Sequence, residues 1–278
     1  LSKVKISGGG RCNVTHACFI PNVLAKFYPR GEKELKGPFH TFCTGDVIEW
    51  FNERGVSLKI EEDGRVFPES DNSQTIIDCF LNEAENFNIK IIKQTIVQQL
   101  SKADDFWKIE TSKDTYQAKQ VVMATGSNVK IWDLLKTVNH SVINPVPSLF
   151  TFNIKDDRIK DLMGVSTEMV SLKVKGSTLK ANGPLLITHW GMSGPAILKL
   201  SAWGARELFD KNYNFQLIVN FTNDLVFDEV LEEIMQQKQQ HPKKTINKHT
   251  HYGLTNRLWQ QLVKASFIPD DSLWADVS

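Results

Sequence analysis

The residues with the clearest capacity for chemistry lie near the start of the chain, in the run Ser7-Gly8-Gly9-Gly10-Arg11-Cys12-Asn13. Three consecutive glycines allow positive φ angles and place no Cβ between the backbone and a ligand. Such a ribbon exposes backbone N–H groups, which can bind an anion or contact a flat ring. Arg11 adds a planar cation, and Asn13 adds a side chain that both donates and accepts hydrogen bonds. The same run is also typical of a flexible turn.

A second landmark is an apolar run that ends in Ala124-Thr125-Gly126. The run predicts a buried parallel strand over Val121–Ala124 that leads into a tight turn. The third is Thr188-His189-Trp190-Gly191-Met192-Ser193-Gly194-Pro195, in which Ser193 or Gly194 caps a helix that opens at Pro195. That helix would direct its free N–H groups at the preceding loop.

His189 is the candidate catalytic residue of the third motif, as a proton donor, because the pKa of an unperturbed histidine lies near neutrality. An equally weighted alternative is structural: Thr188 and His189 tie the end of a strand to the helix cap. For metals, Cys12, His16 and Cys18 form one short cluster without a second half, so no metal site is expected.

Together with Glu62-Asp63-Gly64-Arg65-Val66-Phe67-Pro68, these motifs occur in the order found in the HI0933-like flavoproteins, and the chain resembles that family. The resemblance implies FAD lying extended across the main sheet, with the first motif along the isoalloxazine ring. It implies NAD(P)H as the electron donor. The cofactor-binding residues that it implies are Ser7, Gly8, Gly9, Gly10, Arg11, Cys12, Asn13, Val97, Ala124, Thr125 and Gly126, with Val97 against the adenine.

The family also opens with a GxGxxG turn, which this chain lacks. A second glycine-rich segment that contacts flavin in the family is absent as well. We therefore expect a fragment that lacks both ends and is inactive alone, and whether it holds FAD stays open.

Composition limits the function classes. Hydrophobic residues make up 41% and charged residues 23% of the 278 positions, as in ordinary globular proteins. The net charge of +1 gives no bulk attraction for nucleic acid, which we therefore expect not to be a partner. No apolar run is long enough for a membrane span. The four cysteines lack CxxC spacing and predict free thiols in a reducing, cytoplasmic setting.

The predicted fold class is α/β: a partial FAD/NAD(P)-binding Rossmann-like domain with an inserted, mostly antiparallel β-barrel-like and helical domain. Pro145 and Pro147 mark the boundary between a cofactor domain at 1–144 and a substrate-side domain at 145–278. Asp46 and Ser73 are predicted helix N-caps. Strands are predicted at 56–60, 89–95, 96–101, 106–111, 115–118, 149–154, 170–174, 183–188 and 216–221, and helices at 131–138, 228–239 and 255–265.

Two functions follow from these patterns. The first is an FAD-dependent oxidoreductase, reduced by NAD(P)H, that acts on an unidentified small molecule. The second is a non-catalytic flavin- or RNA-associated binding protein that retains the flavoprotein fold. A nucleotide-dependent transferase is disfavoured, because the lysine and hydroxyl of a P-loop are missing. The sequence leaves the oligomeric state undetermined.

Overall fold

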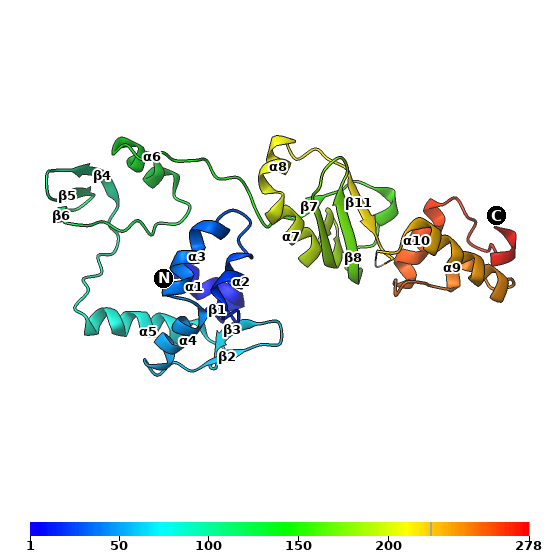
Figure 1. The fold of residues 1–278 in the computed structure, drawn as a ribbon, viewed down its shortest axis with the longest axis horizontal. Helices are drawn as coiled ribbons and strands as arrows, with labels where there is room; N and C mark the ends of the chain where they lie inside the picture. Colours follow the sequence, from blue (N-terminus) through cyan, green and yellow to red (C-terminus); the bar gives the residue numbers. More distant parts are fainter. Residues whose placement is uncertain (223, 278) are drawn as a thin grey trace. The chain divides into compact units, whose positions relative to one another are not determined.

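The computed structural model describes residues 1–222 and 224–277 (Figure 1). The chain forms two compact units, Leu1–Ile143 and Asn144–Ser278. The first carries two small antiparallel sheets with helices α1 to α6, and the second carries a larger antiparallel sheet with helices α7 to α10. The predicted α/β class, with an antiparallel, barrel-like second part, is confirmed.

The first unit opens with a short helix that runs directly into the glycine run. A small sheet of order β1-β3-β2 and four further helices surround a core of Cys12, Phe51, Val56, Ile76 and Cys79. The elements are α1 (Ser2–Ile6), η1 (Ser7–Gly10), β1 (Thr15–His16), α2 (Pro21–Ala25), α3 (Glu32–Thr41), α4 (Thr44–Asn52), β2 (Leu58–Ile60), β3 (Arg65–Pro68) and α5 (Ser73–Asn86).

Two of the predicted helix caps are wrong by a few residues. The N-cap of α4 is Cys43, and its backbone N–H donates to Oδ2 of Asp46 at 2.6 Å. Asp46 thus occupies the third helical position, where a carboxylate reaches back to the cap. The N-cap of α5 is Asn72, whose Oδ1 accepts from the N–H of Gln74 at 2.9 Å. Ser73 instead donates its hydroxyl to the carbonyl of Lys5 at 2.9 Å, which ties α5 to α1.

A three-stranded meander and one helix complete the first unit, as predicted: β4 (Val97–Lys102), β5 (Trp107–Thr111), β6 (Thr115–Ala118) and α6 (Val129–Thr137). The predicted strands at 89–95 and at Val121–Ala124 are wrong. Both stretches are irregular, and Val122 is 89% exposed. The physical reason is that a strand needs a paired neighbour, and no described strand lies beside either stretch.

The second unit is built on a curled sheet of order β11-β8-β9-β10-β7, with antiparallel pairing throughout. Burial alternates strictly along β9, because one face packs on the core and the other faces solvent. A register shift between Thr167 and Val170 on β8 adds local bend. The strands are β7 (Phe152–Asn153), β8 (Ser166–Val174), β9 (Lys180–Thr188), β10 (Gly191–Ser193) and β11 (Leu217–Asn220).

Helices close the core of this second unit. Leu258, Trp259 and Val263 of α10 are buried in the same core as the sheet. The apolar residues of α9, Val230, Leu231, Ile234 and Met235, are predicted to face inward, and this is wrong in part. Ile234 is half-buried and packs against the core, whereas Leu231 and Met235 are 45% and 44% exposed. The elements are η2 (Asp157–Ile159), α7 (Pro195–Trp203), α8 (Ala205–Asp210), α9 (Phe227–Gln240), η3 (Ile246–Lys248), α10 (Asn256–Ala265) and η4 (Trp274–Asp276).

A search of the described helices finds none that combines the length and apolar character needed to cross a bilayer.

Candidate cofactor pocket and histidine loop

The glycine run is bare for two different physical reasons. Gly8, Gly9 and Gly10 all have positive φ, at 56°, 69° and 89°. A Cβ on Gly8 would lie 2.8 Å from the backbone nitrogen of Asn13 and 2.8 Å from Cε1 of Phe67, so packing demands glycine there. A Cβ on Gly9 or Gly10 would meet no atom within 4 Å. The last two glycines therefore present open backbone.

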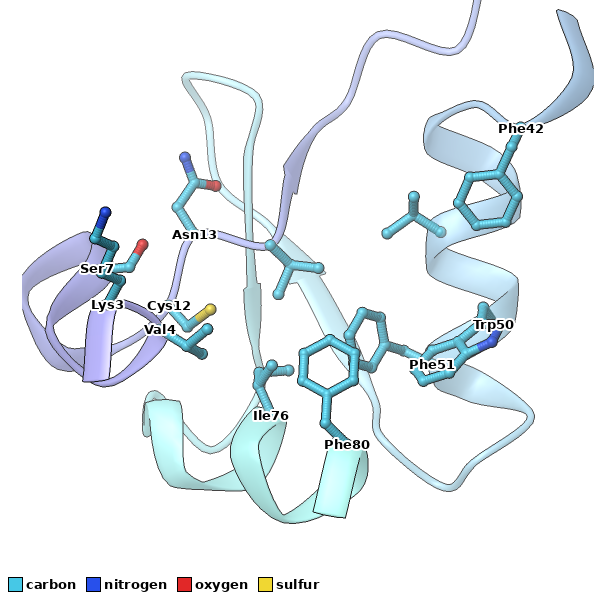
Figure 2. Close-up of a pocket in the computed structure, with 12 residues that line it drawn as sticks. Lys3, Val4, Ser7, Cys12, Asn13, Phe42, Trp50, Phe51, Ile76 and Phe80 are labelled. Carbon is cyan, nitrogen blue, oxygen red and sulfur yellow. The ribbon is translucent and has the colours of Figure 1, made fainter. Parts of the chain in front are cut away.

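A pocket of about 550 Å³ lies beside this run. Figure 2 shows the rings of Trp50, Phe51 and Phe80 on one side and Lys3 and Cys12 on the other. This volume lies in the range of small-molecule sites, which are typically apolar with a few polar groups. The lining residues are Lys3, Val4, Ser7, Cys12, Asn13, Val14, Phe42, Val47, Trp50, Phe51, Ile76 and Phe80.

Cys12 shows how the wall of this pocket is built. The residue is 7% exposed and has a φ of 64°, and its N–H donates to the carbonyl of Ser7 at 2.9 Å. This bond folds the chain back on itself directly after the glycines. Burial raises the pKa of the Cys12 thiol, so the group stays neutral near pH 7.

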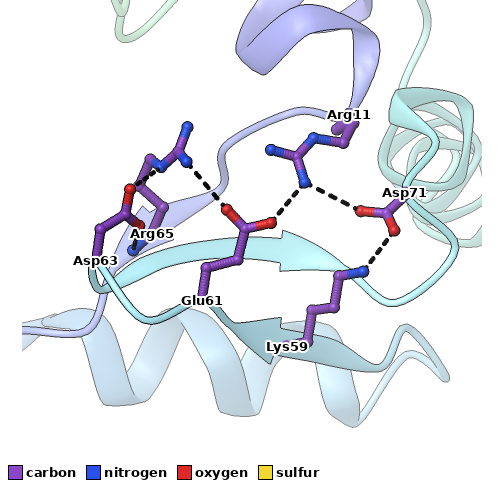
Figure 3. Close-up of polar contacts among 6 residues, drawn as sticks. All are labelled: Arg11, Lys59, Glu61, Asp63, Arg65 and Asp71. Carbon is purple, nitrogen blue, oxygen red and sulfur yellow. Dashed lines mark hydrogen bonds and ion pairs between the residues drawn. The ribbon is translucent and has the colours of Figure 1, made fainter.

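Arg11 does not line the pocket, and its charge is directed elsewhere (Figure 3). Its Nη1 donates to Oε1 of Glu61 at 2.6 Å and to Oδ1 of Asp71 at 3.4 Å. The guanidinium also lies 3.9 Å from the ring centre of Phe67. The hydrogen bond with Glu61 is the main cause of the raised pKa of Arg11. The side chain thus fastens the glycine run to β3.

The two carboxylates extend this contact into a network. Oε2 of Glu61 lies 3.1 Å from Arg65, and Oδ2 of Asp71 lies 2.5 Å from Nζ of Lys59. The hydrogen bond from Lys59 is the first cause of the lowered pKa of Asp71, and Arg11 adds to it. Each ion pair is partly exposed and contributes little stability by itself. The network therefore serves mainly to hold the side chain of Arg11 in place.

The remaining predicted cofactor residues differ in where they lie. Ser7 and Asn13 line the pocket, whereas Val97 sits on β4 and does not. With its NH₂ group turned toward β3, Asn13 would donate to the carbonyls of Thr15 at 2.8 Å and Val66 at 3.2 Å.

Ala124, Thr125 and Gly126 are exposed, and they belong to an irregular segment. Gly126 nevertheless approaches the pocket, because a Cβ on it would lie 3.2 Å from Nζ of Lys3. The structure therefore brings the two glycine motifs of the first unit close together through Lys3, a residue of α1 that the sequence reasoning missed.

His189 lies in the turn between β9 and β10 of the second unit. The exposed ring makes an edge contact with Trp190, at 4.1 Å between ring centres, and lines a polar pocket of about 730 Å³. The Oγ1 atom of Thr188 is buried without a hydrogen-bond partner. The hydroxyl of Thr188 therefore makes no hydrogen bond to the cap, although its backbone pairs with Gly191 of β10. The cap of α7 is Gly194, followed by Pro195 at the first helical position, as predicted.

The tight turn after His189 depends on its glycines. A Cβ on Gly191 would lie 2.2 Å from the carbonyl oxygen of Phe152, and one on Gly194 would lie 2.9 Å from that of Pro184. Because the clashing atoms belong to the backbone, they cannot move aside as a flexible side chain could, and both positions require glycine. The turn thereby holds His189 at the rim of the pocket with Lys155, Asp156, Lys160, Asp161 and Arg257.

Comparison with known proteins places these motifs in a family. The model for the HI0933-like protein Rossmann domain matches residues 1–195, and the model for the HI0933-like protein barrel and H2TH domain matches residues 146–278. Together the two models cover the whole chain.

Curated relatives share about a quarter of their residues with this chain. A ribosomal RNA dihydrouridine synthase of Escherichia coli is 25% identical over 98% of this chain, and one of Haemophilus influenzae is 24% identical over 97%. A 3-dehydro-bile acid delta(4,6)-reductase of Clostridium scindens is 22% identical over 75%. The chain spans 66%, 67% and 52% of the lengths of these three relatives. Two of the names refer to RNA, so the net charge of +1 is insufficient ground for setting nucleic acid aside.

Proposed function

This chain belongs to the HI0933-like family, and on that premise we propose that it forms part of an FAD-dependent oxidoreductase that reduces a carbon–carbon double bond. The observation that carries the proposal is the 550 Å³ pocket, walled by aromatic side chains and lined by Ser7, Cys12 and Asn13, which stand on either side of the glycines in the sequence. The names of the three relatives agree with this reaction type, since a dihydrouridine synthase and a delta(4,6)-reductase both saturate a double bond.

The residues present fit a flat ring system. The pocket is about 550 Å³, and the rings of Trp50, Phe51 and Phe80 give an apolar wall that excludes water. Gly9 and Gly10, which follow the pocket residue Ser7 in the sequence, present backbone with open space beside it. When bound, FAD would supply hydride transfer, with NAD(P)H as the proposed source of electrons. Among the described residues that line the pocket, Lys3 carries the only positive charge. We assign to Lys3 the attraction of an anionic group of the cofactor near Gly126.

His189 remains the proposed proton donor. Reduction of a double bond needs a hydride at one carbon and a proton at the other, and an exposed imidazole at a pocket rim can deliver the proton. His189→Gln should therefore lower the rate of substrate reduction about 10²-fold, while reduction of the flavin by NAD(P)H stays unchanged. A variant with the full rate would remove His189 from the mechanism.

For the substrate, we propose a pyrimidine base in RNA, because the two relatives that match nearly all of this chain bear that activity in their names. The competing substrate is a free conjugated small molecule, as in the bile acid reductase. A cytoplasmic location belongs to the same proposal.

Flavin binding is the first test. The purified protein should show the visible absorbance of bound flavin, or take up added FAD, and anaerobic NADH or NADPH should bleach that absorbance. A colourless protein that also refuses added FAD would refute the proposal.

A non-catalytic flavin- or RNA-binding protein is the second candidate. The pairing of Arg11 with Glu61 and Asp71 favours it, because a guanidinium held by two carboxylates is not free to stabilise the negative charge of a reduced flavin. In that case flavin would bind, but neither nicotinamide would bleach it.

A further inference from the structure

The charge of this chain is unevenly distributed. Residues 234–269, named here the basic segment, contain no Asp or Glu and six cations: Lys238, Lys243, Lys244, Lys248, Arg257 and Lys264. The remaining 242 residues hold 27 Lys and Arg against 32 Asp and Glu, a net charge of −5. The total of +1 therefore conceals a strongly positive stretch, which a windowed count of charge reveals from sequence alone.

The basic segment is held in a defined conformation from α9 to the end of α10. The indole Nε1 of Trp259 donates to the carbonyl of Ile246 at 2.8 Å. The N–H of Ile246 donates to the carbonyl of Ser272 at 3.1 Å, and the N–H of Trp274 donates to the carbonyl of Lys244 at 3.1 Å. These bonds anchor the buried side of the segment.

The lysines lie on the opposite, exposed side. Lys243, Lys244 and Lys248 are exposed, while Ile246 and Asn247 between them are buried. Among the ion pairs of the described residues, none joins these three lysines to a carboxylate. Their charges are thus available to an outside partner.

Histidine rings lie among these lysines. The ring centres of His241 and His249 are 5.4 Å apart, and those of His249 and His251 are 6.2 Å apart. Burial lowers the pKa of His249, and the charge of Lys244 lowers it further. No described group of three His, Cys, Asp or Glu side chains is arranged to hold a metal ion. Burial also lowers the pKa of His251, so the neutral form is favoured for both His249 and His251.

Carboxylates also lie near this surface, because the stretch that pairs with the lysine-rich turn carries Asp270, Asp271 and Asp276. Glu233 faces His251, where its charge favours the protonated ring, and Asp270 accepts a hydrogen bond from the amide of Asn247 at 3.0 Å. Neither is paired with a lysine of the segment.

The far end of the segment adds an aromatic ring and leads to the histidine pocket. Phe267, three residues after Lys264, is 94% exposed. Arg257, at the start of α10, donates to the backbone carbonyl of Asp161 and lines the pocket of His189. Because α10 packs against both η3 and η2, it joins the lysine-rich turn to the rim of that pocket.

We propose that the basic segment is an RNA-binding surface that holds the strand whose base enters the pocket of His189. The inference rests on the proposed function, since it takes RNA as the substrate. Exposed cations without paired carboxylates neutralise phosphates, and exposed rings stack on bases. Single-stranded RNA offers both groups, at a spacing that a flexible chain can adjust.

The test compares two triple variants of equal charge change. Lys243→Glu, Lys244→Glu and Lys248→Glu together alter the basic segment. Lys173→Glu, Lys175→Glu and Lys180→Glu alter exposed lysines of the β8–β9 hairpin in the same unit and serve as the control. Fluorescence anisotropy with a labelled single-stranded RNA, measured across a salt series, reports affinity. Circular dichroism confirms that both variants are folded.

We expect the segment variant to bind at least tenfold more weakly than the control variant at low salt. Loss of three phosphate contacts should also reduce the slope of log affinity against log salt by about 2, at about 0.7 per contact. A second variant, Phe267→Ala, should weaken binding at least fivefold without changing that slope, because stacking is uncharged.

Equal affinity of the two triple variants would overturn the inference, as would binding to anionic vesicles but not to RNA. Flavin absorbance is recorded in the same samples, which separates the two proposals. RNA binding that is lost only in the segment variant supports the inference, even if the protein carries no flavin and the reductase proposal fails. Bleachable flavin with RNA affinity unaffected by the segment variant overturns the inference and leaves the reductase standing.

Discussion

Replacing Gly8 and Gly9 by alanine, one at a time, should separate the two reasons why the glycine run is bare. Both positions have positive φ, so each alanine costs about 1–2 kcal/mol of backbone strain. At Gly8 the new Cβ would also lie 2.8 Å from the backbone nitrogen of Asn13 and from Phe67, whereas at Gly9 it would meet open space. Crowding of this kind adds about 1–3 kcal/mol.

Gly8→Ala should therefore destabilise the first unit by about 2–5 kcal/mol, and Gly9→Ala by only about 1–2 kcal/mol. Urea unfolding followed by tryptophan fluorescence measures the difference, with the early transition assigned to the first unit by its loss in a Phe67→Ala control. Titration with FAD should give the reverse order once stability is accounted for: a methyl group on Gly9 stands where the ring is proposed to lie. Gly9→Ala binding FAD as tightly as the unmodified protein would refute the placement of the ring, and equal stability of the two variants would refute the packing argument.

Three further predictions concern the second unit. The Arg158 guanidinium lowers the pKa of Asp156 to about 2, from an unfolded value of about 3.9, so this carboxylate contributes stability above pH 4 that is lost as the pH falls toward 2. Asp156→Asn should weaken that part of the acid dependence, as measured by urea midpoints at pH 5 and pH 2.5. Burial lowers the pKa of His251 in the folded protein below 6.5, and its Nε2 atom has no hydrogen-bond partner. The neutral ring therefore contributes to folding stability above pH 6.5, and this contribution is lost as the pH falls through the folded pKa. His251→Phe should flatten the decline in thermal midpoint on acidification, and an unchanged decline would contradict this. Trp259→Phe removes one of two donors to the carbonyl of Ile246, which keeps the N–H of His249 at 3.1 Å, and should cost about 0.5–1.5 kcal/mol in urea unfolding. If Trp259→Phe lowered only the unfolding midpoint of the first unit, the predicted role of this hydrogen bond in the second unit would be wrong.

Elements with short-range signals were predictable from sequence. The strands β8 and β9 follow an alternation visible within nine residues, and the N-cap of α10 is Thr255, whose hydroxyl accepts from the N–H of Leu258. Features that depend on distant partners were not. The stretch Val121–Ala124 has the composition of a buried strand, but composition does not supply the neighbour with which a strand must pair.

The candidate site shows the same division. The positive φ angles of the glycines follow from residue type, and Ser7, Cys12 and Asn13 on either side of them line one pocket. The orientation of Arg11 was not predictable from the sequence, because its partners Glu61 and Asp71 lie 50 and 60 positions away. The aromatic wall was not predicted for a related reason: the contact between Phe51 and Phe80 depends on how α4 and α5 pack.

The absence of buried residues in α9 has a consequence for the local stability of the second unit. Local unfolding of α9 exposes little additional apolar surface, because none of its residues is fully buried. Its amide hydrogens should therefore exchange with solvent well before those of α10. The helix begins with Asp228 and Glu229 and ends with Lys238, an order that suits the helix dipole and weakens as salt screens it. A bound ligand can stabilise a helix of this kind. Amide hydrogen exchange of α9, measured with and without RNA, would report that stabilisation directly.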